Sequence, residues 1–148
     1  MTGQAVEGAM TGQDDRRTVE AVITGMFECF AAGDIDGIDA RLDDRVTIWD
    51  VFTPELVTGK AQRDEFHAKD RAQMRARGPL RLAVTQLAVE IRGDVAWAWY
   101  VVDFRYDPPN PLSGLVRVTD VLLRYPETRH GWRITHHHEG LVPVWEGA

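Results

Sequence analysis

The sequence predicts an α+β domain in which helices come first and a mostly antiparallel sheet follows. Near the N-terminus, apolar residues recur at three- and four-residue steps, as in amphipathic helices. Later in the chain, runs rich in β-branched and aromatic residues predict strands, with turn-forming Gly, Pro and Asp between them. The resulting order is two helices, a strand, a helix and four strands. This separation of helices from strands is typical of α+β folds.

The first predicted helix covers residues 14–34, where Asp14 or Asp15 can cap the start and Gly33 stands where a left-handed C-cap belongs. Residues 1–13 lack apolar periodicity and are predicted to form a mobile tail. The folded domain is therefore expected over residues 14–148. The helix has one apolar side, made by Val19, Val22, Ile23, Met26, Phe27 and Phe30.

A short helix over residues 34–42 is predicted to begin at Asp34, and a longer one is expected from Thr58 to the Gly78-Pro79 pair. Gly93 and Asp94 indicate a tight turn between two strands. The predicted strands are "RVTIWDVF", "LRLAVTQLAVEIRG", "DVAWAWYVVDFRYD", "GLVRVTDVLLRY" and "GWRITHHHEGLVPVW".

Composition limits the classes of function. The 148 residues fit one domain, and 44% hydrophobic with 27% charged residues is ordinary for a globular protein. A net charge of −6 argues against a nucleic-acid or anionic-membrane partner. The N-terminus has no secretory signal pattern, no apolar run could span a bilayer, and the single Cys29 cannot form an internal disulfide. We therefore expect a cytoplasmic protein.

Four stretches together resemble the SnoaL-like and ketosteroid-isomerase-like families of the nuclear transport factor 2-like superfamily. They are "AAGDIDGIDARLDDRVTIWD", "TGKAQRDEF", "GDVAWAWYVVDF" and "VRVTDVLLRY" with the closing "GWRITHHHEGL". The resemblance covers residues 17–143. It implies helices packed in a strongly curved, mainly antiparallel sheet, which forms a cone with an internal apolar pocket. The substrate does not follow, because this fold hosts many activities.

The resemblance also implies site positions. Counting without a gap from Gly33, the general-base aspartate of the ketosteroid isomerases falls at Asp50. Met26 and Phe30 lie on the helix that closes the pocket in this family. Because alternate strand residues face opposite sides, the strand residues expected to point inward are Trp99, Val101, Asp103, Arg117, Thr119, Val121, Ile134, His136 and His138.

Two departures argue against steroid isomerase chemistry itself. The tyrosine that stabilises the enolate in those isomerases falls at Met26, and their protonated aspartate falls at Val121. The neighbouring Asp120 is expected to point the other way. The two donors of an oxyanion hole are therefore not expected at the family positions.

The candidate residues allow more than one chemistry. Burial would raise the pKa of Asp50 and make it a general base, although Asp50 could instead cap a loop at the strand end. His136 and His138 share one face of the last strand, and could act as acid and base, form core hydrogen bonds, or bind a metal with Asp103 or Asp50. Asp103 could also pair with Arg117. His137 and Glu139 are expected on the outer face.

We therefore expect an enzyme that uses acid–base chemistry and neither cofactor nor metal: a cyclase, isomerase or dehydratase of a small apolar carbonyl compound of polyketide or terpenoid type. Asp50 would take a proton, His136 or His138 would donate to the oxyanion, and Asp103 would tune the imidazole. One alternative is a non-catalytic ligand-binding or accessory subunit, and another is a metal-dependent enzyme. A homodimer packed through the outer face of the sheet is also expected.

Overall fold

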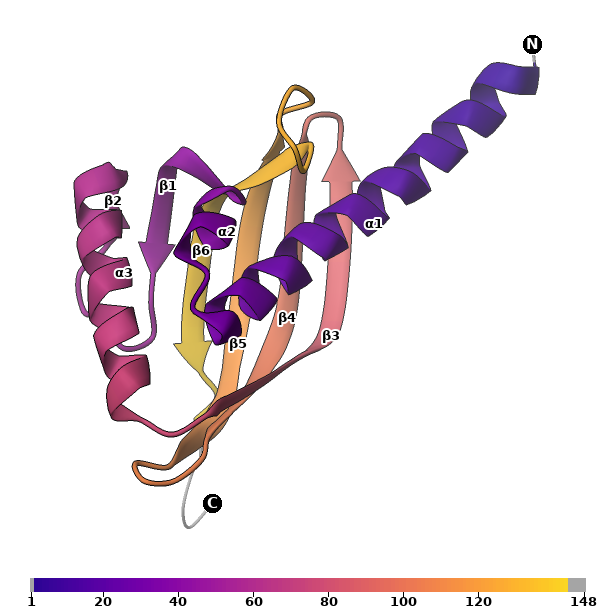
Figure 1. Ribbon diagram of the computed structural model, residues 1–148. Coiled ribbons are helices and arrows are strands. Elements are labelled where there is room, and N and C mark those ends of the chain that lie inside the picture. The colour runs from indigo at the N-terminus through magenta and orange to yellow at the C-terminus, as the bar shows by residue number, and fades with distance from the viewer. Residues whose placement is uncertain (1, 144–148) are drawn as a thin grey trace.

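The computed structural model describes the backbone of residues 2–143 and the side chains of residues 12–143. Six strands form one curled, unclosed sheet in the order β2-β1-β6-β5-β4-β3, and the helices pack in its concave face (Figure 1). All strand pairs are antiparallel except β1 with β6, which is parallel. The elements are α1 (Thr2–Ala32), α2 (Ile35–Asp39), β1 (Leu42–Trp49), β2 (Val57–Thr58), α3 (Gly59–Ala76), β3 (Leu80–Arg92), β4 (Val95–Tyr106), β5 (Leu112–Arg124) and β6 (Trp132–Leu141).

The local signals in the sequence are found where they were predicted. Gly33 ends α1 with a φ of 72°, in the left-handed region. Asp34 caps α2, because its Oδ1 accepts the N–H of Gly37 at 3.0 Å. Gly93, with a φ of 58°, makes the turn between β3 and β4. Thr58 is the N-cap of α3, but its side chain makes no capping hydrogen bond.

The first helix differs from the prediction. It begins at Thr2 and so includes residues 1–13 apart from Met1, which were expected to be a tail. In Figure 1 its N-terminal part extends beyond the edge of the sheet. Asp14 and Asp15 consequently lie within the helix and do not cap its start. No helix among residues 2–143 is both long and apolar enough to cross a bilayer.

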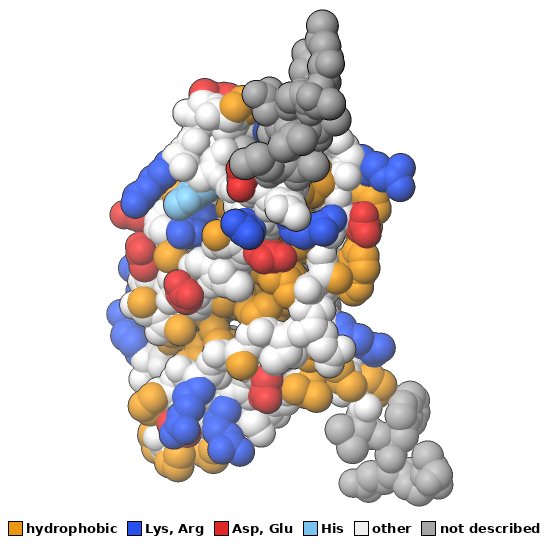
Figure 2. Space-filling model, turned by 90° about the vertical axis from the view of Figure 1, so that its right-hand side faces the viewer, with side chains coloured by type: hydrophobic (Ala, Val, Ile, Leu, Met, Phe, Trp, Pro, Cys, Tyr) orange, Lys and Arg blue, Asp and Glu red, His pale blue; other side chains and the backbone are white. Residues whose placement is uncertain are grey.

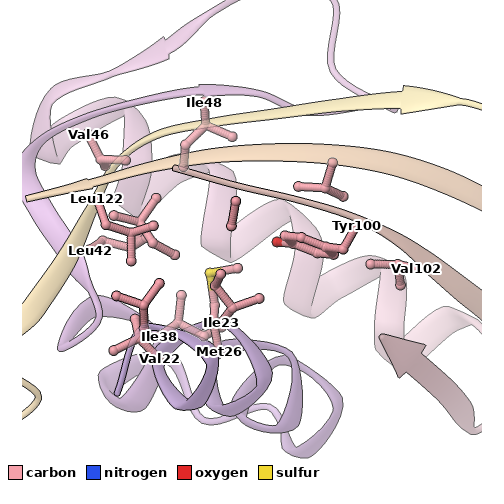
Figure 3. Packing of buried hydrophobic residues seen from close by; sticks show 14 of the residues in the cluster. Val22, Ile23, Met26, Ile38, Leu42, Val46, Ile48, Tyr100, Val102 and Leu122 are labelled. Carbon is pink, nitrogen blue, oxygen red and sulfur yellow. The ribbon is translucent and has the colours of Figure 1, made fainter. Parts of the chain in front are cut away.

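The core lies between α1 and the concave face of the sheet. Val22, Ile23 and Met26 point from α1 toward buried strand residues (Figure 3). Ala96 and Ala98 of β4 are fully buried on this face. Apolar burial of this kind is the main favourable contribution to the free energy of folding.

The last strand contains a β-bulge. In the pairing of β5 with β6, Leu122 lies opposite Ile134 and Val121 lies opposite His136, which leaves Thr135 as the extra residue. A bulge shifts the alternation of inward and outward side chains by one position. Ile134 and His137 are therefore both buried, although they are three residues apart.

One cluster of charged residues connects α1 to the end of β5 and to the turn between β3 and β4. The guanidinium of Arg124 donates from Nη1 and Nη2 to the two carboxylate oxygens of Asp15 at 2.7 and 2.9 Å, and from Nε to Asp94 at 3.0 Å. Its central carbon lies 4.4 Å from the centroid of the Trp132 ring. The hydrogen bond from Arg124 lowers the pKa of Asp15. Arg124 therefore connects α1, the β3–β4 turn and β6.

We predict that Arg124→Lys lowers the free energy of unfolding by about 1–3 kcal/mol, because an ammonium can neither form the two-nitrogen pair nor stack flat on an indole. The measurement is urea unfolding followed by tryptophan fluorescence. Arg81→Lys is the matched control. Arg81 also donates to one carboxylate through two nitrogens, but its side chain is 71% exposed. The control should change stability by less than about 0.5 kcal/mol; equal losses in both variants would contradict the role of Arg124.

Candidate active site

A cavity of about 120 Å³ lies between α1, α3 and the concave face of the sheet. Its walls are mainly apolar, and six of the lining side chains are aromatic: Phe27, Phe30, Phe52, Phe66, Phe104 and Tyr106. Phe52 is 52% exposed, so the cavity reaches solvent beside it. The side of the molecule shown in Figure 2 is hollowed at its middle, where hydrophobic side chains gather between charged ones. The polar lining residues are Asp50, His67, Asp70, Gln73, His137 and Glu139.

Three of the residues predicted for the site line this cavity. Met26 and Phe30 reach it from α1, and Asp50 reaches it from the end of β1. Asp50 also caps a turn, as the alternative prediction proposed, because its Oδ2 accepts the N–H of Phe52 at 2.9 Å and the hydroxyl of Thr53 at 3.1 Å. The capping bonds orient the carboxyl group and do not remove it from the cavity. Its catalytic role stays a prediction.

The prediction of which β4 and β5 side chains point into the pocket is wrong. Trp99, Asp103 and Arg117 are exposed, and neither they nor Val101 and Val121 line the cavity. The buried residues of β4 are the alternate set from Ala96 to Tyr106, and on β5 they include Val116, Val118, Asp120 and Leu122. The expected Asp103–Arg117 ion pair is not among the pairs of residues 12–143. These side chains belong to the convex face.

The predicted facing of β6 is correct at Ile134 and wrong from His136 onward, because the bulge at Thr135 reverses the alternation. His136 and His138 lie on the outer side, where His136 Nδ1 is 2.6 Å from the hydroxyl of Thr47. His137 and Glu139, which were expected to face outward, line the cavity.

The two-histidine-one-carboxylate metal site consequently does not form from His136 and His138. In the described part of the chain, no group of three or more His, Cys, Asp or Glu side chains is arranged to hold a metal ion.

Behind the cavity wall, four side chains form a continuous hydrogen-bonded row across three strands. The hydroxyl of Tyr100 donates to Asp120 Oδ2 at 2.6 Å, and Asp120 Oδ1 lies 2.5 Å from His137 Nδ1. His137 Nε2 lies 2.9 Å from Glu139 Oε2. Glu139 Oε1 accepts the N–H of Val51 at 3.2 Å. The row runs from β4 through β5 and β6 to the loop after β1.

His137 carries a positive charge in this row. Burial alone would lower its pKa, but the charge and hydrogen bond of Asp120, and then those of Glu139, raise that pKa well above the ordinary value. Both ring nitrogens face carboxylate oxygens, so both carry a proton. Burial would likewise raise the pKa of Glu139, but the hydrogen bond and charge of His137 outweigh it and lower that pKa to about 2. Glu139 is therefore ionised at the cavity wall.

The parallel pairing of β1 with β6 sets Asp50 beside Glu139. Trp49 is in register with His138, so the next residue of each strand faces the cavity at the same level. Burial, the charge of Glu139 and a hydrogen bond with its carboxyl raise the pKa of Asp50 to about 7. Two carboxyl groups this close share one proton over the neutral pH range, as coupled acids do. The pair can therefore accept or release a proton near pH 7.

The opposite wall is made by α3, where His67, Asp70 and Gln73 follow at three-residue steps. Burial, followed by the charges of Asp50 and Glu139, raises the pKa of Asp70 to about 7. His67 Nε2 lies 3.1 Å from Asp39 Oδ1, and Arg63 Nε lies 3.3 Å from the same oxygen. Burial lowers the pKa of His67, which is consequently neutral at pH 7.

The sequence of β4 itself indicates which of its side chains are buried. Asp103 and Arg105 occupy one alternate set, whereas the other set from Ala96 to Tyr106 contains no charged residue. A sheet with one buried face puts the uncharged set inside. Asp70 had only the helical periodicity of α3 as a signal, and that face also carries charged Arg63.

We predict that Asp70→Asn stabilises the protein at pH 8 and has a much smaller stabilising effect at pH 5. The folded pKa of Asp70, about 7, lies above the ordinary aspartate value of 3.8, so its contribution to stability is fully present below the unfolded pKa and is lost progressively as pH rises to 7. A neutral amide removes this loss. The gain at pH 8 should reach up to about 4 kcal/mol, because one pKa unit corresponds to about 1.4 kcal/mol.

Thermal unfolding of both proteins at the two pH values measures this effect. Asp64→Asn is the control on the same helix, since Asp64 is exposed and paired with Lys60 at 2.9 Å. A gain for Asp70→Asn that is equally large at pH 5 would contradict the assigned titration.

Comparison with curated proteins finds no match to this sequence. Solved structures share the fold. A nuclear transport factor 2-like protein with a cystatin-like fold from Novosphingobium aromaticivorans superposes with a TM-score of 0.79 at 18% identity, over 97% of this chain and 92% of the other. A proposed dehydratase of the same family from Streptomyces avermitilis gives 0.72 at 20% identity, over 90% and 99%. The calcium/calmodulin-dependent kinase II hub of S. rosetta gives 0.71 at 20% identity, over 85% and 95%.

At these identities the similarity shows the fold and not an activity. The fold is the one expected from the sequence, with helices packed against a curled six-stranded sheet. The family model of the SnoaL-like domain matches residues 19–144. This match covers most of the chain, and the protein therefore belongs to the family of SnoaL-like domains.

Proposed function

We propose that this protein is a cofactor-independent enzyme that moves a proton on a small, largely apolar carbonyl compound, as an isomerase, cyclase or dehydratase does. The observation that carries the proposal is Asp50, a carboxyl group with a pKa of about 7 beside ionised Glu139 in an apolar cavity. A general base is most effective when its pKa lies near the working pH. The similar fold of the proposed dehydratase from S. avermitilis is compatible with this class of reaction.

In the proposed step, ionised Asp50 accepts a proton from a carbon next to the substrate carbonyl. The proton then rests on the Asp50–Glu139 pair, where its charge is offset, and it can return to a different carbon of the substrate. His137 keeps Glu139 ionised, because its two N–H groups are bound by Asp120 and Glu139. His136 and His138 have no part in this step, since they lie outside the cavity.

A non-catalytic function is the main alternative, because a kinase hub domain shares the fold. A subunit that only binds or assembles has no need for carboxyl groups that titrate near pH 7 inside an apolar cavity. Desolvating a charge costs free energy, and perturbed pKa values concentrate at sites of chemistry. The Asp50–Glu139 pair therefore favours the enzyme.

We predict that the protein speeds exchange of hydrogen for deuterium next to the carbonyl of aryl and cyclic ketones such as 2-tetralone, and that Asp50→Asn slows this exchange at least about 100-fold, the lower range for removing a general base. Exchange in D₂O is followed by NMR. The rate should rise tenfold per pH unit below about 7 and level off above it, because Asp50 acts when ionised. Asp103→Asn, on the outer face, is the control. Equal exchange in Asp50→Asn and wild type would refute the assigned base.

We also propose a homodimer packed through the outer face of the sheet. Trp49, Trp99 and Leu115 are 40%, 45% and 44% exposed there. Trp49, His138, Thr119 and Trp99 lie opposite one another on neighbouring strands, so one cross-strand row contains two tryptophans. Exposed apolar side chains grouped on one face are typical of protein–protein contacts.

Trp99→Glu is predicted to convert a dimer of the 16.7 kDa chain into a monomer, because a buried unpaired charge opposes association. Light scattering after size-exclusion chromatography gives the mass. Phe52→Glu is the control, since Phe52 is as exposed but lies at the cavity. A wild-type monomer, or a dimer that survives in Trp99→Glu, would count against this interface.

A further inference from the structure

The charges around the cavity do not balance. The single positive charge of His137 offsets only one of its two carboxylate partners, Asp120 and Glu139, and neutral His67 lies beside the Asp39–Arg63 pair. Asp50 and Asp70 are the cavity-lining carboxyl groups for which this count leaves no positively charged partner. No lysine or arginine is among the cavity-lining residues of the described chain. Two carboxyl groups on opposite walls therefore have no cation of the protein to pair with.

Asp70 shows this most clearly. Between residues 12 and 143, no hydrogen bond or ion pair is formed by its carboxyl group. Only burial and the negative charges of Asp50 and Glu139 shift its pKa, and all three raise it. Arg77 lies over Tyr106, with its guanidinium carbon 5.1 Å from the ring centroid. A partly buried carboxyl without a partner costs free energy that a ligand could recover.

The aromatic rings of the cavity suit the same kind of ligand. Phe104 contacts Phe52 and Tyr106 edge-to-face, with ring centroids 6.1 and 6.4 Å apart. Burial, followed by the charge of Asp70, raises the pKa of Tyr106, so the carboxyl and this ring are near each other. Ring faces attract cations, as the position of Arg77 over Tyr106 illustrates.

We propose that the substrate of this enzyme carries a protonated amine, which binds between Asp70 of α3 and the Asp50–Glu139 pair of the sheet while its apolar body lies against the aromatic walls. The inference rests on the proposed function, since it names the chemical class of the compound on which Asp50 acts. An anionic compound is excluded by the same charges, because like charges in a cavity of low polarity repel strongly.

An ammonium group also helps the proposed chemistry. It supplies three donors to carboxylate acceptors. A positive charge beside Asp50 and Asp70 lowers the pKa of both, so binding releases protons and leaves Asp50 ionised, the form that accepts a proton from carbon. Amine affinity should therefore increase from pH 5.5 to pH 8, as the carboxyl groups that face the ligand ionise.

Three probes of similar shape test the proposal: 2-phenylethylamine, 2-phenylethanol and 3-phenylpropanoate. NMR titration of the full chain at pH 7.5 should give an affinity for the amine at least about tenfold above that for the alcohol, and weaker binding of the carboxylate than of either. Asp70→Asn should remove the preference for the amine and leave the affinity for the alcohol unchanged. Glu65→Gln is the matched control, because Glu65 lies on the same helix with its side chain 68% exposed.

Equal affinity for amine and alcohol, or a preference that persists in Asp70→Asn, would overturn the proposal, as would binding of none of the probes. These outcomes can be distinguished from those of the ketone exchange experiment, which tests Asp50 as the general base. Ketone exchange that depends on Asp50, without amine preference, would retain the proposed function and overturn this inference. Amine preference without such exchange would support the ligand class and count against the enzyme.

Discussion

His137 is held between two carboxylates inside the sheet, and the arrangement of the cavity depends on this contact. Asp120 comes from β5, Glu139 from β6, and Tyr100 of β4 adds a donor to Asp120. Taking three charged groups out of water costs free energy, which their mutual attraction offsets only when the geometry satisfies each donor and acceptor. The row therefore requires β4, β5 and β6 to keep one register. Glu139 also accepts the N–H of Val51, which fixes the loop that carries Asp50.

The effect of this row on Asp50 is electrostatic. An ionised Glu139 next to a half-buried carboxyl makes a second negative charge unfavourable, so the pKa of Asp50 rises. Without His137, burial would raise the pKa of Glu139, and its repulsion of a charge on Asp50 would weaken. The imidazolium thus determines which member of the pair titrates near pH 7. In the proposed step its role is to position and to polarise, since its two ring nitrogens are engaged by Asp120 and Glu139.

Much of the fold could be predicted from the sequence, because its signals are local. Gly33, Asp34 and Gly93 determine element ends through backbone conformation and short-range hydrogen bonds. The site could be predicted only in part. Asp50 was found from its place after Gly33, whereas the histidines were assigned to the wrong faces. The reason is the bulge at Thr135. It arises from the pairing of β6 with β5 and β1, and a threonine at this position does not by itself indicate a bulge.

The placement of Asp50 and Asp70 is unfavourable for stability, and this distinguishes them from the other buried charges. Arg63, Asp120 and His137 each have oppositely charged partners, so their burial is compatible with a purely structural role. Asp50 and Asp70 have raised pKa values because their surroundings oppose ionisation. An amide side chain would stabilise the folded state at Asp70 above neutral pH, because Asp70 makes no hydrogen bond in the described part of the chain that would be lost. Carboxyl groups kept in a cavity against this cost are explained by what enters the cavity: a proton for Asp50, and a cation for Asp70.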